Sequence, residues 1–128
     1  MNRLLSLLFC LCLLSCQQQT DDKPANMIPQ QKMVRILADI HITEALIERN
    51  VSYPDTALVL YADKHTGILK KHAVEKQAFE STYRYYLTHL PEMDKLYEIV
   101  VDTLSVRESQ AEAIKAKSDT IPAVRSLK

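Results

Sequence analysis

Hydrophobic residues recur at helical spacing along most of the chain after residue 28. The first such segment spans residues 29–50, and Pro29 suits its opening turn because proline has no amide hydrogen to leave unpaired. On a wheel of about 3.6 residues per turn, five large apolar side chains fall on one stripe: Met33, Ile36, Leu37, Ile40 and Ile47. The pattern predicts a helix with one buried face.

Residues 51–55 interrupt this pattern, with Pro54 restricting its neighbour and Asp55 a candidate N-cap. A second helix is expected from near Thr56. Its inward positions recur at spacings of three and four: Leu58, Tyr61, His65, Ile68 and His72. This register passes through Gly67, so we expect an uninterrupted helix at a cost of about 1 kcal/mol relative to alanine. The alternative is a break at Gly67.

The hydrophobic phase changes around residues 73–75, and two more helices are expected after it. The third helix carries its apolar face on Phe79, Tyr83, Tyr86 and Leu90. Pro91 ends that helix and begins the fourth, whose stripe is Met93, Leu96, Tyr97, Val100 and Leu104, continued weakly by Ala111 and Ile114. The tail from 118–128 is expected to be loose. Together the patterns predict an all-α fold, a small antiparallel bundle of about four helices over residues 29–117.

Ahead of this domain, the chain begins with features of a secretory signal. Arg3 gives a positive start, and residues 4–14 are almost wholly apolar, about 11 residues where a membrane span needs about 20. The segment ends Leu13-Leu14-Ser15-Cys16, which resembles the bacterial lipobox. Residues 1–15 are therefore interpreted as a lipoprotein signal peptide. An ordinary secreted protein cut elsewhere, or a buried amino-terminal helix, is the alternative.

The lipobox resemblance implies where in the cell the protein is located. In that class the cysteine thiol receives a diacylglyceryl group, cleavage occurs before the cysteine, and the new amino terminus is usually acylated with a fatty acid such as palmitate. Lipid on Cys16 would then anchor the protein stably, because each buried methylene contributes about 0.8 kcal/mol and more than one chain is attached. Residues 16–28 are interpreted as a flexible tether. We expect a protein of the cell envelope, anchored in the outer membrane, with its periplasmic or surface face left open.

Composition narrows the classes of function. The chain has 16 basic and 16 acidic residues and a formal net charge of zero, so a nucleic-acid partner is not expected. One glycine and no tryptophan disfavour an array of tight hairpins. Two of the three cysteines, Cys10 and Cys12, lie in the signal, so no disulfide framework can form within a mature monomer. No nucleophile elbow or phosphate loop occurs, and we expect neither an enzyme nor a cofactor.

The order of several short motifs resembles a known family. These motifs are Ile28-Pro29, Lys32-Met33, Ile36-Leu37, Asp39-Ile40-His41, Glu44-Ala45, Ile68-Leu69-Lys70-Lys71-His72, Phe79, Tyr85-Tyr86 and Leu96-Tyr97. With the lipobox, they resemble a family of short Bacteroidota lipoproteins catalogued as a domain of unknown function, of the DUF 4296 type, over roughly residues 28–105. That family usually has a glycine and a small N-capping residue before the third helix, where this chain has Ala73 and Glu75. The resemblance implies an envelope address and a helical fold, and no mechanism.

One polar cluster stands out on the first helix. Glu44 projects within the apolar stripe, where an unpaired carboxylate is costly, and His41 and Glu48 lie about one turn away on the same flank. The favoured interpretation is a carboxylate at a helix interface, paired with a tyrosine hydroxyl, a histidine or Arg84. The alternative is a metal, acid/base or small-ligand site built from His41, Glu44 and Glu48.

A second cluster lies on the third helix, where Arg84 stands among three tyrosines. Tyr83 and Tyr86 occupy the core stripe, which leaves Arg84 and Tyr85 pointing elsewhere as a candidate partner surface. The sequence thus predicts a noncatalytic helical interaction or scaffold module that binds an unknown envelope protein, with metal or small-ligand binding as the alternative.

Overall fold

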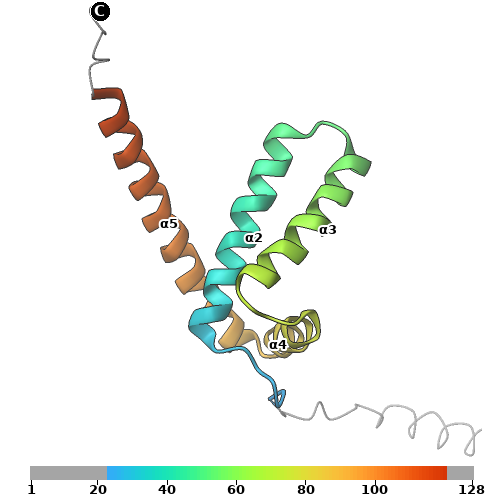
Figure 1. Ribbon diagram of the computed structural model, residues 1–128. Coiled ribbons are helices and arrows are strands. Elements are labelled where there is room, and N and C mark those ends of the chain that lie inside the picture. Colours follow the sequence, from blue (N-terminus) through green and yellow to red (C-terminus); the bar gives the residue numbers. More distant parts are fainter. Residues whose placement is uncertain (1–22, 121–128) are drawn as a thin grey trace, which may run out of the picture.

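The computed structural model describes residues 23–120, in which four helices follow one another (Figure 1). They are α2 (Gln30–Asn50), α3 (Pro54–Lys71), α4 (Lys76–Thr88) and α5 (Leu90–Thr120). No strand occurs among these residues, and the predicted all-α class is confirmed. α3 begins two residues before the expected Thr56, because Pro54 itself occupies the opening turn. α5 continues to Thr120, past the expected helix end at 117.

The predicted signal peptide, Cys16 and most of the tether fall in residues 1–22, and most of the predicted tail falls in residues 121–128. These segments lie outside the described residues. Between residues 23 and 120, no helix combines the length and the apolar character that crossing a bilayer requires.

α2 is the central helix and packs against both α3 and α5. α2 and α3 form a helical hairpin, and α4 lies across its base in contact with α3 and α5. α5 starts at this base, passes α2 and then diverges from the hairpin, so that the two form the arms of a V (Figure 1).

The core lies where α2 crosses α5. Met33, Ile36 and Leu96 are fully buried, and Val100 is exposed by 1%. Burying a side chain of this size contributes about 1.5–3 kcal/mol. The predicted stripes of the first and fourth helices therefore form one core, and all five residues predicted for the stripe of the first helix are buried.

Four positions of the predicted apolar stripes are exposed. Leu58 is 68% exposed, Leu90 66% and Ile114 70%, and Ala111 is also exposed. Leu58 lies in the first turn and a half of α3, and this end of α3 is at the tip of the hairpin, away from α4 (Figure 1). Leu90 is the first residue of α5, since α4 already ends at Thr88. Periodicity places a residue on a face but does not say whether a neighbouring helix reaches it.

The folded part begins before the expected end of the tether at residue 28. Ile28 is 5% exposed, and Met27 packs against the core. The Ile28 amide donates a hydrogen bond of 3.0 Å to Oγ1 of Thr82, a threonine that is fully buried in α4. The hydroxyl satisfies an amide that would otherwise be buried without a partner.

The connection from α3 to α4 confirms the predicted change of phase. Gly67 lies inside α3, as expected. The Ala73 amide donates to the Lys70 carbonyl and the Val74 amide to the Leu69 carbonyl, each at 3.0 Å, which is the Schellman pattern that closes a helix. This pattern requires a left-handed residue, and Ala73 has φ 48. Alanine thus stands where glycine is favoured.

Candidate functional site

Glu44 is the centre of the predicted polar cluster, and its carboxylate is paired. Oε1 accepts a hydrogen bond of 2.6 Å from the Tyr61 hydroxyl, and Oε2 lies 2.9 Å from Nδ1 of His41. The side chain is half-buried, with 35% of its surface exposed. Tyr61 comes from α3, so its hydrogen bond to Glu44 joins α3 to α2, the two helices of the hairpin. Of the partners expected, a tyrosine and a histidine are present, whereas Arg84 is exposed on α4.

His41 connects this pair to α5. Since an ionised carboxylate only accepts, Nδ1 of His41 donates the hydrogen bond to Glu44. Nε2 is buried without a hydrogen-bond partner among the described residues, and the ring lies against Tyr97, with centroids 5.7 Å apart. The imidazole of His41 therefore packs at the interface of α2 and α5.

The phenols of this region are held in their neutral form. Burial, and next the hydrogen bond to Glu44 and its charge, raise the pKa of Tyr61 to about 12. Burial, and next a hydrogen bond with Tyr83, also raise the pKa of Tyr97. A phenol with a raised pKa keeps its proton at neutral pH, so it can donate a hydrogen bond but is a poor acid or base there. The cluster is thus suited to fixing the positions of α2, α3 and α5.

The alternative ligand set is not assembled. The side chains of His41 and Glu44 meet, but Glu48 is exposed one turn further along α2. Across residues 23–120, no group of three or more histidine, cysteine, aspartate or glutamate side chains is placed to hold a metal ion. Tyr61 of α3, rather than Glu48, is the second side chain that contacts the Glu44 carboxylate beside His41.

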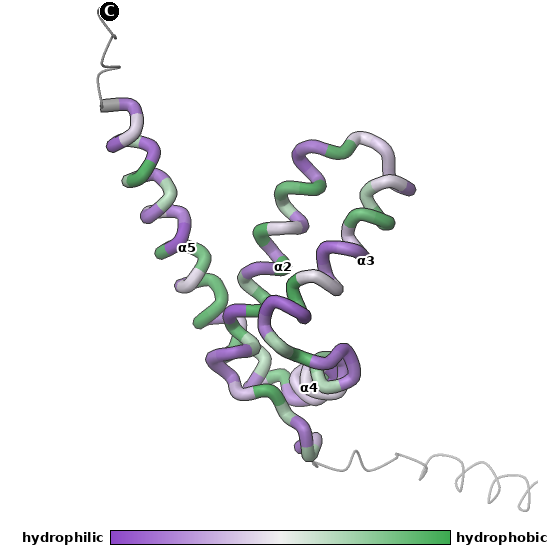
Figure 2. The backbone as a smooth tube through the Cα atoms, in the orientation of Figure 1, coloured by the Kyte–Doolittle hydropathy of each residue, from purple (hydrophilic) through white to green (hydrophobic). Residues whose placement is uncertain are grey.

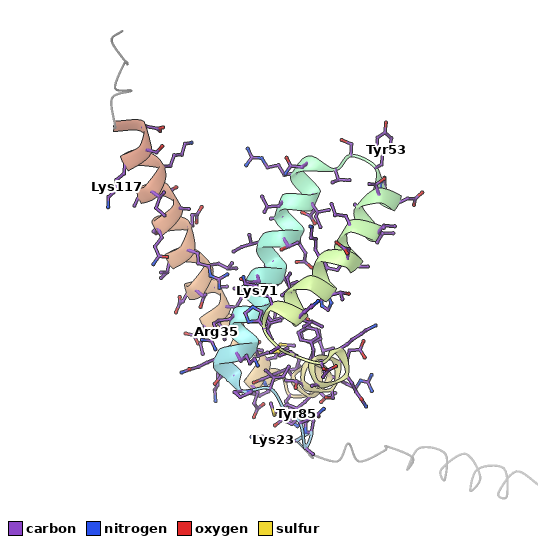
Figure 3. All side chains as sticks on the ribbon, viewed as in Figure 1. Lys23, Arg35, Tyr53, Lys71, Tyr85 and Lys117 are labelled. Carbon is purple, nitrogen blue, oxygen red and sulfur yellow. The ribbon has the colours of Figure 1, made fainter. Side chains whose placement is uncertain are left out.

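Of the two residues expected to form a partner surface on α4, one is exposed as predicted and the other is buried. Arg84 is exposed as predicted, but Tyr85 is 8% exposed and belongs to the core. Its ring stacks on His89 with centroids 3.9 Å apart, in the region near the base of the molecule shown in Figure 3. The α4 stripe is wider than the predicted one, because Ile28 and α5 cover an additional flank of the helix.

Asp39 forms a second polar centre that sequence reasoning missed. Its Oδ2 accepts hydrogen bonds from Lys71 at 2.9 Å and from His72 at 2.8 Å, and its Oδ1 accepts one from Arg107 at 2.6 Å. The side chain is 14% exposed. One carboxylate on α2 therefore joins the end of α3 to the middle of α5, in the central region around the labelled Lys71 in Figure 3. The motif Asp39-Ile40-His41 was visible in the sequence, but its distant partners were not.

The charge state of Asp39 follows from these contacts. Burial alone would raise the pKa of this carboxyl group. The hydrogen bonds from His72, Lys71 and Arg107, together with the charge of Lys71, outweigh it and lower the pKa to about 2. Asp39 is therefore ionised throughout the neutral range.

Two of the grooves on the surface of residues 23–120 could bear on binding. The larger, of about 750 Å³, lies beside α3 and its connection to α4, and its walls mix Tyr61, His65, Lys70, Glu75 and Lys76. Such a mixture of charges does not define one ligand chemistry. The smaller, of about 450 Å³, lies between the arms of the V. Its lining is mainly apolar on both arms: Ile42 from α2, and Val101, Leu104, Ser105, Arg107, Glu108 and Ala111 from α5.

The apolar lining continues onto exposed surface. Leu46 follows Ile42 by one turn of α2 and is 55% exposed. On α5, every side chain from residue 108 to residue 119 is exposed, including Ile114 at 70%. Figure 2 shows hydrophobic and hydrophilic positions alternating along this projecting arm. We call the surface formed by Ile42, Leu46, Leu104, Ala111 and Ile114 the V-groove surface.

Comparison with known proteins places the chain in a family. The model for "Domain of unknown function (DUF4296)" matches residues 24–110, which contain α2, α3, α4 and most of α5. Comparisons with curated proteins and with solved structures give no match. The matched region is more than half of the chain, and it includes Asp39, Glu44 and the residues that bind them. The chain belongs to the DUF4296 family, which is defined by a domain of unknown function.

Proposed function

We propose that this protein is a lipid-anchored protein of the bacterial envelope whose helical domain is a noncatalytic docking module. The observation that carries the docking role is the V-groove surface, which presents apolar side chains on both arms. Solvent-exposed apolar surface gathered in one place is typical of a protein-binding site. The envelope address rests on the lipobox-like Leu13-Leu14-Ser15-Cys16.

The polar centres support a structural scaffold rather than a catalytic one. Glu44 has hydrogen-bonding partners for both of its oxygens, and the raised pKa of Tyr61 makes the phenol unsuited to proton transfer at neutral pH. Asp39 has its oxygens paired with three cationic or potentially cationic side chains. Both centres hold α2 against its neighbours, which keeps the arms of the V at a defined spacing.

The docking role is tested by site-specific photo-cross-linking in cells. A photoreactive amino acid at Ala111 lies in the groove, whereas one at Val106, which is 55% exposed on another face of α5, is a matched control. We expect a discrete protein adduct from position 111 and none from position 106. No adduct at 111, or equal adducts at both positions, would contradict the docking role.

The anchor is tested separately. Cys16→Ser removes the thiol that would carry the lipid, so incorporation of radiolabelled palmitate should cease and the protein should leave the membrane fraction. The variant should retain the helical circular dichroism spectrum, because the four described helices lie after residue 29. A variant that is still acylated and still bound to membranes would disprove the anchor.

A further inference from the structure

The projecting arm of α5 has the shape and pattern of a helix that pairs with another helix. Residues 108–119 are all exposed and extend about 18 Å at 1.5 Å per residue. The stripe that α5 buries in its own core at Val100 continues onto this arm at heptad spacing, through Ala111 and Ile114. The same apolar stripe is therefore buried in the core near the start of α5 and exposed near the end of α5.

The two arms of the V complement each other. The groove between them is lined by Ile42 of α2 and by Leu104 and Ala111 of α5, and the end of α5 carries Ile114, an exposed apolar side chain next to the small Ala111. A small residue lets a second helix approach closely, and a large apolar residue fills the space. The molecule thus carries both an apolar groove and a helix with the matching apolar stripe.

The charged residues beside this stripe indicate which partner fits the groove. Glu108 lines the groove, and Lys115 lies seven residues later on the same flank of α5, about 10 Å along the axis. The two are too far apart to pair within one helix. When two such helices run antiparallel, with Ala111 of each opposite Ile114 of the other, Glu108 of each comes beside Lys115 of the other. The arrangement has two-fold symmetry, so it makes this pair twice.

The surface area that two copies could bury favours insertion of each α5 into the groove of the other copy over contact between the two α5 helices alone. Half the surface of a helix about 18 Å long and about 10 Å across is about 300 Å², whereas a standard interface buries about 800 Å² on each partner. Insertion of each α5 into the groove of the other copy covers both of its flanks and also Ile42 and Leu46 of α2. That arrangement approaches the standard size.

We infer that the V-groove surface binds a second copy of this chain, with the two α5 helices antiparallel and each inserted between the arms of the other. This inference rests on the proposed docking function and names its partner. The same surface patch is used on both copies, as a closed two-fold interface requires.

The test uses two full-length copies with different tags, expressed in the same cells and purified from membranes through one tag. We expect both tags in the eluate. Ile114→Lys should lower the recovery of the second tag about tenfold, because it places a charge at the centre of the interface. Val106→Lys adds the same charge to another exposed apolar position of α5 and should leave the recovery unchanged.

Charge reversal identifies the second copy as the occupant. Glu108→Lys in both copies should lower the recovery, since it places a second positive charge beside Lys115 of the other copy, and adding Lys115→Glu should restore it. A zero-length carboxyl-to-amine cross-linker applied to mixed light and heavy isotope-labelled wild-type chains should join Glu108 to Lys115 between chains. Failure of the reversal to restore recovery, or absence of the mixed-isotope cross-link, overturns the inference.

The outcomes also separate this inference from the docking function. Copies that do not co-purify, together with a discrete adduct of a different protein from position 111, overturn the second copy and leave the docking function intact. Copies that do not co-purify, together with no adduct at all, overturn both. Equal losses in Ile114→Lys and Val106→Lys overturn the assignment of the interface to the V-groove surface.

Discussion

Arg107 donates a hydrogen bond of 2.6 Å to Asp39, a residue 68 positions earlier in the chain. The contact marks the point at which α5 leaves the rest of the molecule, because every side chain from residue 108 to residue 119 is exposed. Asp39 also accepts hydrogen bonds from Lys71 and His72 at the end of α3. The Asp39 carboxylate therefore holds α2, the end of α3 and the middle of α5 together at the point where the two arms of the V separate.

Asp39→Asn should lower the free energy of unfolding by about 1.5–3 kcal/mol, the usual contribution of a hydrogen bond to a charged group. The substitution keeps the size of the side chain but leaves Lys71, His72 and Arg107 close together without a negative charge. Urea denaturation followed by circular dichroism measures the loss. Asp63→Asn is the control, since Asp63 is exposed on α3 and should change stability by less than about 0.5 kcal/mol. Equal stability of the two variants would refute the role given to Asp39.

The stabilisation by Asp39 should depend on pH in the acid range. The carboxyl group has a pKa of about 2 in the folded protein, against an ordinary value of 3.8. A lowered pKa stabilises the fold fully above about pH 4, and this contribution is lost as pH falls towards about 2. The urea midpoint of the wild type should therefore approach that of Asp39→Asn over this window. A difference between the two proteins that stays constant down to pH 2 would contradict the assignment.

Tyr61 should titrate well above an ordinary phenol. Its pKa of about 12 comes first from burial and then from Glu44, so Glu44→Gln should lower that pKa. The difference between the ultraviolet phenolate titrations of the wild type and Glu44→Gln measures the change. Because the pKa is raised in the folded state, the stabilisation is present below about pH 10 and lost as pH rises towards about 12. A Tyr61 titration that is the same in the wild type and Glu44→Gln would rule out the contact.

Gly67→Ala should stabilise the protein by about 0.5–1 kcal/mol. Gly67 lies within α3, and apart from the adjoining backbone of that helix no atom lies within 4 Å of where a Cβ atom would stand. The methyl group therefore adds no clash, and alanine loses less conformational freedom than glycine on entering a helix. Thermal unfolding followed by circular dichroism measures the effect. A lower melting temperature would show that α3 does not run unbroken through this position.

The opposite exchange is expected at Ala73. Alanine at this position has φ 48, a left-handed conformation that costs an L-residue about 1–2 kcal/mol and glycine almost nothing. Ala73→Gly should therefore raise stability by up to about 1 kcal/mol, after allowance for the greater freedom of glycine in the unfolded chain. Urea denaturation of Gly67→Ala, Ala73→Gly and the double variant should show gains that add. A loss on Ala73→Gly would argue against the Schellman closure.

The helical class could be predicted from the sequence because helix periodicity is local. The stripe containing Met33, Ile36 and Ile40 repeats every three or four residues, and any protein environment that buries it must do so on one side. The passage of α3 through Gly67 follows from the same local rules, and so does a helix boundary close to Pro91, which the structure places at His89. The pairing of Glu44 was also expected in kind, because a carboxylate within an apolar stripe needs a partner.

Spacing along the chain was enough to predict where the helices lie, which stripes can be buried and which polar residue needs a partner, because these depend on residues within about one turn of each other. The tertiary structure settled which stripes are covered. It buried Tyr85, exposed Leu58, gave Tyr61 rather than Arg84 to Glu44, and joined Asp39 to Arg107. Each of these depends on where the helices cross one another, and a crossing point is set by packing between residues far apart in the chain.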